Sequence, residues 1–267
     1  ARMKKTREAG RPLYTVGAGT GISAKFVEAG GADLVSTYPI AKYRMAGLSS
    51  MAGYLPLCDS NATTLEMGER EILPIIKEIP VAAGLLGADP TRDMNRLLDR
   101  VWEVGFSGIL NCPTLALVDG NYRLALEETG LSFAREVEMI RLARLKDLFT
   151  HAFCSTVKET ELMVEAGCDM VVAHMGNSVG GTIGSKTVVS IDEAVEKIQT
   201  ICDTAKKRNP EVLVICHGGP IAFPEDFQQV FRRTSNLDGF MGGSSGERFP
   251  VEKGVAEVTG KYKAISR

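Results

Sequence analysis

The sequence predicts an α/β fold in which eight parallel strands alternate with helices and close into a (β/α)8 TIM barrel. Short apolar runs recur along the chain without polar alternation, as is typical of strands buried on both faces. Stretches long enough for a helix lie between them. A helix end followed by glycine and then by an apolar run occurs three times, at Gly30, Gly105 and Gly167. Since glycine readily adopts the left-handed conformation that ends a helix, we interpret this pattern as a repeated unit.

Eight such units in 267 residues average about 33 residues each, a usual length for a strand and its helix. The expected domain organisation is an N-terminal lead over residues 1–12 and a single barrel domain over residues 13–267. An open doubly wound sheet is the alternative, but it needs edge strands with polar alternation, and none is clearly marked. The expected strands are Leu13–Val16, Asp33–Tyr38, Val81–Leu86, Gly108–Cys112, Phe149–Cys154, Met170–His174, Val212–Cys216 and Gly239–Met241.

Three capping boxes predict helix starts, because the hydroxyl and the carboxylate of this motif satisfy free backbone N–H groups. They are Thr63-x-x-Glu66, Thr156-x-x-Glu159 and Ser190-x-x-Glu193. The first is expected to open a helix over Glu66–Lys77, and the third a helix that runs to Lys207. The last two helices are expected to begin with proline, at Pro224 and Pro250.

Composition and charge narrow the classes of function. A formal net charge of −2 without a basic block gives no reason to expect a nucleic-acid partner. No apolar run reaches the roughly 18 residues of a membrane span, so no membrane association is expected. Six cysteines without a C-x-x-C pair favour free thiols in a reducing compartment, and hence a cytoplasmic protein. We expect a homo-oligomer, as is common for barrels, and the basic lead is compatible with a longer polypeptide.

Two glycine-rich runs near the end of the chain predict an anion site. Cys216-His217-Gly218-Gly219-Pro220 and Gly242-Gly243-Ser244-Ser245-Gly246-Glu247-Arg248 each follow an apolar, strand-like run. Glycines let backbone N–H groups approach a ligand, and a helix N-terminus adds partial positive charge. In a (β/α)8 barrel, the loops after the last two strands often bind phosphate. The alternative is that both runs are ordinary tight turns.

The longer loops all follow strands, so they lie on the C-terminal face of the predicted barrel. Residues 39–60 show no clear periodicity and carry Arg44 among several hydroxyl-bearing side chains. Residues 175–186 form another long loop, whereas the connections from helix to strand are short. Because long loops in compact domains often serve binding, this asymmetry indicates the functional face.

His174 and His217 are the expected acid–base residues. They end the sixth strand and follow the seventh, which are neighbours in a barrel, so their side chains should lie within reach of each other. An imidazole has an unperturbed pKa of about 6.5 and can act as an acid or a base. The third histidine, His151, lies within a strand and is more simply explained as a core residue.

Asp89 and Glu247 are the carboxylates expected near strand ends. Asp89 follows the third strand, and Glu247 lies in the turn after the eighth. Either could orient a histidine, and together with the histidines they could bind a divalent ion. Two alternatives stay open: Asp89 as the N-cap of the next helix, and Glu247 as the ion-pair partner of Arg248. Asp33, Asp169 and Asp238 start strands and belong to the opposite, stability face.

Four segments together resemble the phosphoenolpyruvate hydrolase-like family, also described as a TIM-barrel signal-transduction family. They are Gly17-Ala18-Gly19-Thr20-Gly21, Tyr43-Arg44-Met45-Ala46-Gly47 and the two glycine-rich runs. The resemblance spans about residues 10–265 and extends to the C-terminal part of plant tobamovirus-resistance proteins. It implies a barrel related to phosphoenolpyruvate mutases and phosphonopyruvate hydrolases. Mutase-type enzymes hold Mg²⁺ through acids at the ends of strands two, three and four, of which only Asp89 is matched here.

The expected function is that of a hydrolase or lyase acting through an enolate on a small anionic phospho- or oxo-carboxylate, such as phosphoenolpyruvate or phosphonopyruvate. His174 and His217 would transfer protons, while Asp89 or Glu247 would orient a histidine or, for Asp89, hold Mg²⁺. The expected substrate-binding residues are Gly19, Arg44, Asn111, Gly218, Gly219, Gly243, Ser244 and Ser245. The alternative is a non-catalytic regulatory barrel that binds a small ligand, which the missing acids on strands two and four favour.

Overall fold

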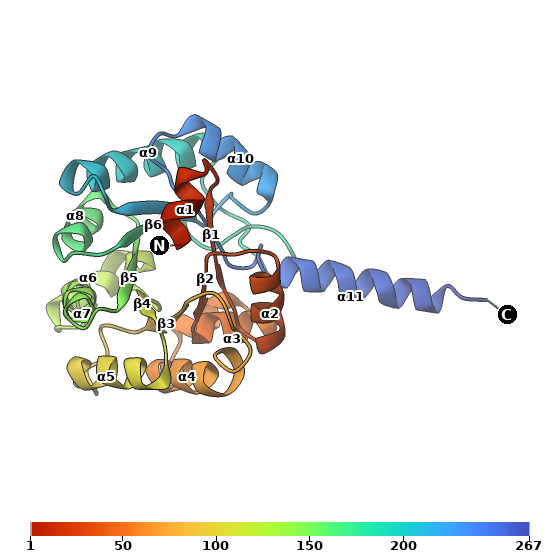
Figure 1. Ribbon diagram of the computed structural model, residues 1–267, viewed down its shortest axis with the longest axis horizontal. Helices are drawn as coiled ribbons and strands as arrows, with labels where there is room; N and C mark the ends of the chain where they lie inside the picture. Colours follow the sequence, from red (N-terminus) through yellow and green to blue (C-terminus); the bar gives the residue numbers. More distant parts are fainter. Residues whose placement is uncertain (1, 267) are drawn as a thin grey trace.

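The computed structural model describes residues 2–266 and is a closed barrel of eight parallel strands (Figure 1). Each strand pairs with the next one in sequence, and β8 closes the barrel against β1. The strands are β1 (Leu13–Gly17), β2 (Leu34–Thr37), β3 (Val81–Leu85), β4 (Gly108–Asn111), β5 (Phe149–Cys154), β6 (Met170–His174), β7 (Leu213–His217) and β8 (Gly239–Gly242). The predicted fold class is confirmed, and each predicted strand lies within one residue of the observed bounds.

Most of the helices surround the barrel, whereas α1 (Arg2–Glu8) lies at one end of it and α11 (Arg248–Lys263) projects away (Figure 1). The helices between them in sequence are α2 (Gly21–Ala29), α3 (Pro39–Met45), α4 (Ser60–Met67), α5 (Met94–Val104), α6 (Gly120–Glu128), α7 (Phe133–Leu145), α8 (Val157–Glu165), α9 (Ile191–Arg208) and α10 (Pro224–Arg233). Short 3₁₀ turns are η1 (Ser50–Tyr54) and η3 (Leu115–Leu117), and η2 (Gly68–Ile72) is a π turn. The capping boxes of α8 and α9 and the proline start of α10 are confirmed.

The glycine predicted to end three helices is found at two of the predicted positions and one residue later at the third. Gly105 and Gly167 have φ values of 106° and 86°, in the left-handed region expected after a helix. After α2 the left-handed residue is Gly31, with φ 90°, because Gly30 still has right-handed helical angles. A glycine in the left-handed conformation therefore also follows α2, one residue later than predicted.

Three helix predictions are wrong in their bounds. The helix predicted over Glu66–Lys77 begins at Ser60 as α4, because Asp59 Oδ1 accepts the Ala62 N–H at 3.0 Å and caps the helix earlier than Thr63. Residues 39–60, expected to lack helices, contain α3, which Pro39 opens at its first position, and η1. The last helix, α11, begins two residues before Pro250.

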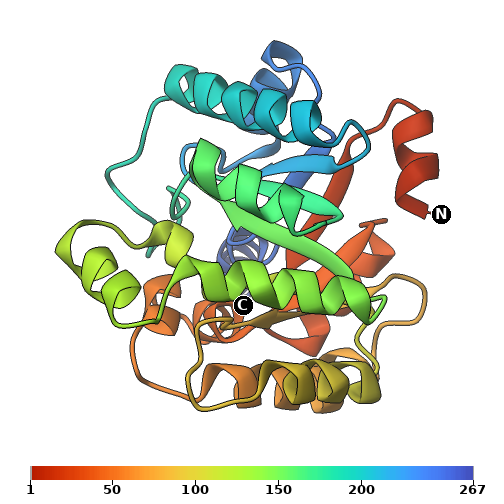
Figure 2. The same cartoon turned by 90° about the vertical axis from the view of Figure 1, so that its left-hand side faces the viewer.

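At the amino-terminal end of the barrel, where the strands begin, three aspartate carboxylates link neighbouring strands. This agrees with the stability role expected for these aspartates. Asp33, Asp169 and Asp238 each accept a backbone N–H from the start of a neighbouring strand, at Tyr14, Thr150 and Val214. The Thr6 hydroxyl of α1 donates to Asp33 Oδ1 at 2.8 Å, so α1 packs on this face. Figure 2 shows α1 at one end of the barrel and the long loop after β6 at the other.

The barrel interior is packed, and His151 belongs to it. His151 is fully buried, and its Nε2 lies 3.5 Å from Ser36 Oγ, which agrees with the core interpretation. Burial lowers the pKa of His151 to about 3. The apolar interior includes Leu110, Val172 and Met241, and a larger apolar layer separates the strands from the helices.

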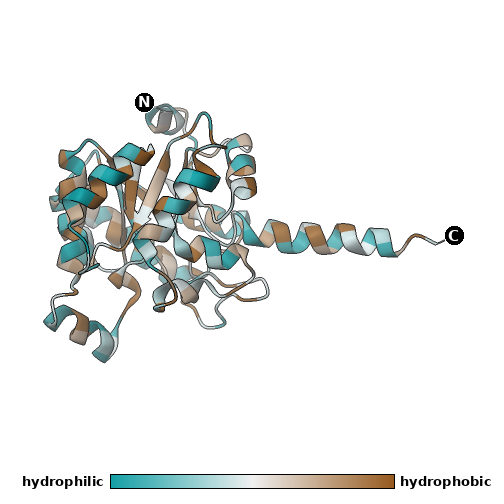
Figure 3. Ribbon diagram, turned by 90° about the horizontal axis from the view of Figure 1, so that it is seen from below, coloured by the Kyte–Doolittle hydropathy of each residue, from teal (hydrophilic) through white to brown (hydrophobic). Residues whose placement is uncertain are grey.

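The helix α11 departs from the barrel pattern, because it projects away from the body (Figures 1 and 3). Its first turn contacts the barrel, and from Val255 onward its described residues are exposed. Apolar residues recur along it (Figure 3). Over residues 2–266, no helix is both long and apolar enough to cross a membrane.

Candidate active site

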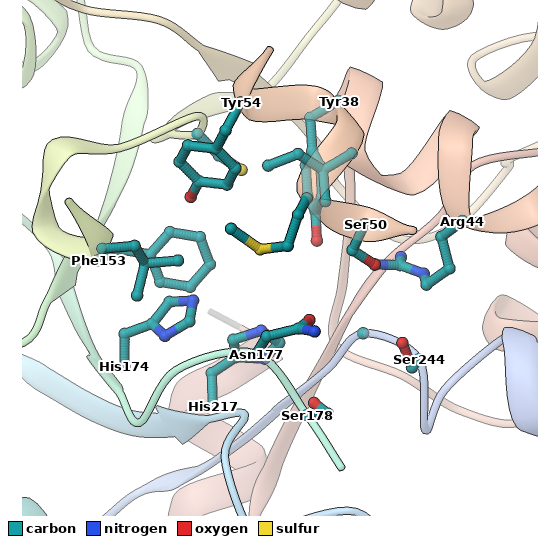
Figure 4. A pocket seen from close by; sticks show the side chains of 15 residues that line it. Tyr38, Arg44, Ser50, Tyr54, Phe153, His174, Asn177, Ser178, His217 and Ser244 are labelled. Carbon is teal, nitrogen blue, oxygen red and sulfur yellow. The ribbon is translucent and has the colours of Figure 1, made fainter. Parts of the chain in front are cut away.

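A cavity opens at the carboxyl ends of the strands, on the face that carries the long loops (Figure 4). The space inside it that is open to a water-sized sphere has a volume of about 40 Å³, which is more than one water molecule needs. Its lining residues are Tyr38, Ile40, Arg44, Ser50, Met51, Tyr54, Cys112, Leu117, Phe153, His174, Asn177, Ser178, His217, Gly243 and Ser244. Of the predicted site residues, the cavity brings together His174, His217, Arg44, Gly243 and Ser244.

The two histidines lie next to each other at the ends of β6 and β7, where the strand register pairs them directly. Their ring centroids are 4.7 Å apart and their planes are inclined by 78°. Phe153, near the end of β5, packs against both rings at centroid distances of 4.6 and 5.4 Å. Figure 4 shows the three rings grouped on one side of the cavity. The neighbouring strands thus place the histidines within reach of one ligand.

A backbone partner fixes the proton on each imidazole. The Gly176 N–H donates to His174 Nδ1 at 3.0 Å, so this nitrogen carries no proton and the neutral ring is protonated at Nε2. His217 Nδ1 lies 2.7 Å from the carbonyl oxygen of Met241, which can only accept, so Nδ1 donates and Nε2 keeps a free lone pair. The pair therefore offers the cavity one N–H donor and one acceptor.

Both imidazoles are neutral at pH 7. Burial, reinforced by the positive charge of Arg44, lowers the pKa of His217 to about 4 despite its hydrogen bond to Met241. Burial and the neighbouring His217 lower the pKa of His174 well below its ordinary value. Burial also raises the pKa values of the Tyr38 and Tyr54 hydroxyls, which stay protonated.

Arg44 and Glu247 form a buried ion pair at the edge of the cavity. Arg44 Nε and Nη2 donate to Glu247 Oε1 at 2.9 and 2.5 Å, and Nη2 also donates to the Gly17 carbonyl at 2.7 Å. Glu247 Oε2 accepts the Gly19 N–H at 2.9 Å and the Ser23 hydroxyl at 2.7 Å. Four donors thus surround one carboxylate, which joins the segments after β1, β2 and β8.

These contacts give structural roles to two residues predicted to act in the site. Glu247 is engaged by protein donors and does not line the cavity, and the alternative pairing with Arg248 is wrong, because Arg248 pairs with Glu252 at 2.5 Å. The Gly19 N–H serves Glu247, and a Cβ at Gly19 would lie 2.1 Å from the Ala41 carbonyl oxygen. Close packing therefore explains why residue 19 is glycine.

Asp89 lies outside the cavity lining, in the loop after β3. Its carboxylate accepts hydrogen bonds from the Thr91 hydroxyl at 2.6 Å, Asn61 Nδ2 at 2.9 Å and Arg92 Nη1 at 3.1 Å. Burial raises the pKa of Asp89, but these hydrogen bonds outweigh it and hold the pKa below its ordinary value. The alternative role as an N-cap is wrong, because Asp93 caps α5.

The side chains around the cavity do not fit a protein-held Mg²⁺ ion. Mg²⁺ favours octahedral oxygen ligands that usually include one or two carboxylates. Throughout residues 2–266, no three side chains of His, Cys, Asp or Glu converge on one point. The acid expected to hold the ion, Asp89, is already bound by Arg92 and Asn61. These side chains therefore support no catalytic step through a metal.

Asn111, predicted to bind substrate, belongs to a buried network around Glu136. Asn111 Nδ2 and the Thr114 hydroxyl both donate to Glu136 Oε2 at 2.7 Å, and the Leu115 N–H donates to Oε1 at 2.7 Å. Burial raises the pKa of Glu136 to about 7, although these hydrogen bonds favour the carboxylate. The network fixes the loop after β4, against which Tyr54 packs. Glu136 lies within α7 on an ordinary helical pattern, so no sequence signal pointed to it.

The two glycine-rich runs serve different purposes. Gly218 and Gly219 lie outside the cavity lining, with φ values of 77° and 58°, and a Cβ would lie 2.1 and 2.5 Å from the carbonyl oxygens of Gly176 and Met175. They let the loops after β6 and β7 touch, as tight turns do. The run after β8 places Gly243 and Ser244 in the lining, while Ser245 lies behind it with a buried, unpaired hydroxyl.

Several lining residues belong to the long loops expected on the functional face but were not among the predicted site residues. Tyr38 directly follows β2, Ser50 and Tyr54 belong to η1, and Asn177 and Ser178 lie in the loop after β6. The rule that residues just beyond barrel strands face the site could have identified Tyr38. The others depend on how two long loops fold back over the barrel, which periodicity does not describe.

This fold and this cavity define a (β/α)8-barrel protein with a pair of histidines at the carboxyl ends of its strands. The chain belongs to the phosphoenolpyruvate hydrolase-like family, whose sequence profile matches residues 1–265. The family resemblance drawn from the glycine-rich and Arg44 segments is therefore confirmed.

Curated relatives include longer proteins. The chain is 47% identical over 265 residues to the tomato (Solanum lycopersicum) ToMV susceptible protein tm-1(GCR26), covering 99% of the chain and 35% of that protein. It is 35% identical to a putative transcriptional regulatory protein, y4pA, of Sinorhizobium fredii, covering 96% of the chain and 42% of that protein. The chain thus spans about a third of the tomato relative's length.

Solved structures share the fold. A phosphonopyruvate hydrolase in complex with oxalate and Mg²⁺ superposes with a TM-score of 0.64 at 16% identity, covering 98% of this chain and 87% of that one. A phosphoenolpyruvate phosphomutase from Streptomyces platensis subsp. rosaceus superposes with a TM-score of 0.63 at 13% identity, covering 99% and 86%. At this identity the similarity establishes the barrel architecture.

Proposed function

We propose that this barrel is a lyase or hydrolase that breaks a bond next to the carbonyl group of a small oxo-carboxylate through an enolate. The observation that carries the proposal is the pair of neutral imidazoles, His174 with its proton on Nε2 and His217 with a free Nε2 lone pair. A donor and an acceptor held side by side in a cavity are what proton transfer around an enolate requires. The family and the similar barrels of phosphonopyruvate hydrolase and phosphoenolpyruvate phosphomutase support this reaction class.

His217 acts as the base. Its Nε2 takes a proton from a hydroxyl group, which belongs to the substrate in a lyase reaction and to a water molecule in a hydrolase reaction. In a lyase reaction the deprotonated oxygen becomes a carbonyl oxygen, and in a hydrolase reaction the water oxygen bonds to the departing group. In both, the bond from the α-carbon to that group breaks, and its electron pair forms the enolate. Protonated His217 returns the proton to the enolate carbon, so protons and electrons balance without an oxidant or reductant.

His174 acts as a neutral hydrogen-bond donor. Because the Gly176 N–H occupies its Nδ1, this ring resists becoming an imidazolium and keeps its Nε2–H for the ligand. A fixed donor aimed at the developing enolate oxygen stabilises the transition state more than the ground state.

Product analysis by NMR tests the proposal. The purified protein is incubated with oxo-carboxylates that carry a hydroxyl group two carbons from the carbonyl, and in parallel with phosphonopyruvate and phosphoenolpyruvate, each with and without Mg²⁺. We expect cleavage of at least one oxo-carboxylate, and a loss of about 10²–10⁴-fold in His217→Gln if His217 is the base. Absence of turnover with every compound would contradict the proposal.

A non-catalytic, ligand-binding regulatory role is the second candidate. The observation in its favour is that Asp89, the acid expected to serve a mutase-type reaction, is tied to Arg92 and Asn61. The similarity to a putative transcriptional regulatory protein supports it as well. This role predicts a compound that raises the melting temperature and is recovered unchanged after long incubation.

We also propose that the chain self-associates through α11. Val251, Val255, Val258 and Tyr262 are 45–73% exposed and follow the 4-3-4 spacing of a helix–helix seam. The start of α11 borders an apolar groove formed by Tyr14, Ile22, Phe26 and Val27, so the seam and the groove form one surface.

A second copy fits this surface better than the chain's own helix. The first turn of α11 is fixed in its outward direction, because Glu252 accepts a hydrogen bond from the Thr182 hydroxyl at 2.7 Å and Arg248 Nη2 donates to the Gly180 carbonyl at 3.2 Å. The seam of one copy therefore cannot fold back onto its own groove without breaking these contacts. Two copies related by a two-fold axis can cover both seams. The six free cysteines support a reducing, cytoplasmic location for such an assembly.

A further inference from the structure

We infer that the cavity takes a 2-oxo monocarboxylate with one negative charge and an apolar side chain, rather than a substrate that bears a phosphate or phosphonate group. The oxo group rests on the proposed function. The single charge and the apolar side chain rest on the charges and contacts of the cavity itself.

The cavity has no unbalanced positive charge. Among the lining residues, Arg44 is the one that is ionised at pH 7, and Glu247 accepts two of its hydrogen bonds at 2.9 and 2.5 Å. Both histidines are neutral, as are the Tyr38 and Tyr54 hydroxyls. Because a doubly charged phosphonate loses its hydration on entry, it needs a fixed positive charge in return, and the ion pair supplies none.

The donors next to the Arg44–Glu247 ion pair suit one small anion. Arg44 Nε and Nη2 are engaged by Glu247 and the Gly17 carbonyl, which leaves Nη1. A Cβ at Gly243 would lie 3.5 Å from this nitrogen, so the absence of a side chain at Gly243 keeps it accessible from the cavity. The Ser244 N–H, free of described protein acceptors, lies in the next residue. Two donors match the two oxygens of one carboxylate.

Part of the remaining lining is an apolar wall, which stands beside the polar side chains of Ser50, Asn177 and Ser178. Ile40, Met51, Leu117 and Phe153 line the cavity together with the ring of Tyr54. Phe153 packs against both histidine rings, so an alkyl group on the ligand would contact apolar surface close to the reacting groups. Burying such a group stabilises the complex by about 0.8 kcal/mol per CH₂. A phosphate group placed against this wall would find no donor.

Calorimetric titration measures the preference directly. The wild-type protein at pH 7.5 is titrated with 2-oxobutyrate and 2-oxoisovalerate, and separately with phosphonopyruvate and phosphoenolpyruvate, each with and without millimolar Mg²⁺. We expect the monocarboxylates to bind at least about tenfold more tightly, with or without Mg²⁺. Equal or tighter binding of phosphonopyruvate under either condition would overturn the inference.

Two variants test the charge explanation. Glu247→Gln keeps the shape of the side chain and leaves Arg44 with an unbalanced positive charge, so the preference should shift toward phosphonopyruvate by about tenfold or more. Leu117→Arg adds a positive charge at a lining position outside the ion pair and should shift it in the same direction, which covers the case in which Glu247→Gln fails to fold. An unchanged preference in a folded variant would contradict the inference.

Measuring binding and conversion separately distinguishes a failure of the monocarboxylate preference from a failure of the proposed catalytic function. Monocarboxylates that bind in preference but are never converted would support the inference and contradict the catalytic proposal. A phosphonate that binds in preference and is cleaved would overturn the inference and leave the catalytic proposal standing.

Discussion

The Arg44 guanidinium and the Glu247 carboxylate meet inside the protein, with Nε 2.9 Å from Oε1 and side chains that are 4% and 0% exposed. The two residues are 203 positions apart and come from the segments after β2 and β8. Glu247 also receives the Gly19 N–H from the segment after β1. One ion pair therefore links the segments that follow β1, β2 and β8, at the carboxyl end of the barrel where β1 and β8 pair.

Removing one member of the Arg44–Glu247 ion pair should strongly destabilise the folded protein. Arg44→Met leaves the Glu247 carboxylate buried without its cation, so we expect the free energy of unfolding to fall by about 3–5 kcal/mol. Urea unfolding monitored by circular dichroism measures this change. The matched control is Arg141→Met, which removes a bidentate pair with Glu138 at the surface and should cost no more than about 1 kcal/mol. Similar losses in both variants would show that burial does not decide the effect.

The two histidines should carry their protons on different nitrogens. At pH 7 we expect protonated Nε2 and unprotonated Nδ1 in His174, and the reverse in His217, because Gly176 donates to the first ring and Met241 accepts from the second. Long-range ¹⁵N–¹H correlation spectra of histidine-labelled protein distinguish these forms. Two rings of the same tautomer, or an imidazolium at pH 7, would be incompatible with the arrangement.

Stability should decline as the pH falls. Burial lowers the pKa values of His217 to about 4 and His151 to about 3, whereas both are about 6.5 in the unfolded chain. Between these values the unfolded chain binds more protons at these two residues, so their contribution to the free energy of unfolding decreases from about pH 6.5 to about pH 3. His217 alone contributes on the order of 3 kcal/mol, since one pKa unit corresponds to about 1.4 kcal/mol.

The variant His217→Gln provides the comparison for this pH dependence. Its free energy of unfolding, measured in urea between about pH 7 and pH 4, should decline less steeply than that of the wild type. His151 and His174 stay in place in both proteins and contribute to the slope that remains. Parallel slopes would mean that His217 is not held neutral in the folded protein.

Charge on the α11 seam should disrupt self-association. Val258→Glu places a carboxylate in the middle of the exposed apolar seam, and we expect light scattering after gel filtration to report a monomer in place of a dimer. Lys253→Glu introduces the same residue on another face of α11 and should leave the dimer intact. A wild-type monomer at micromolar concentration would rule out this interface.

The barrel could be predicted because the sequence patterns that indicate its strands and helix ends each lie within a short segment. Buried parallel strands give continuous apolar runs, and Gly105 and Gly167 end helices through their own φ preference, so neither depends on distant residues. The bounds of α4 failed because Asp59 and Thr63 both resemble N-caps, and only packing decides between them. Local signals also missed η1, whose side chains fold back over the cavity.

The site was predicted in part. His174 and His217 could be placed together, because they follow neighbouring strands whose order the fold dictates. The partner of Glu247 could not be predicted, since Arg44 lies 203 residues away and sequence proximity favoured Arg248. The same limit applies to Asn111, whose role depends on Glu136 from a helix on the outer layer. Contacts such as Arg44–Glu247 form only when the barrel closes and brings distant segments together. The sequence of either segment alone does not identify its partner.

The role proposed for His217 is to remove and return protons around an enolate. Proton NMR in D₂O tests it most directly, by following the exchange of the C3 protons of 2-oxobutyrate and 2-oxoisovalerate with solvent deuterium. We predict that the wild-type protein accelerates this exchange above the buffer rate and that His217→Gln, folded to the same extent, loses the acceleration. Exchange at the buffer rate with the wild-type protein, or equal exchange with the variant, would contradict the claim.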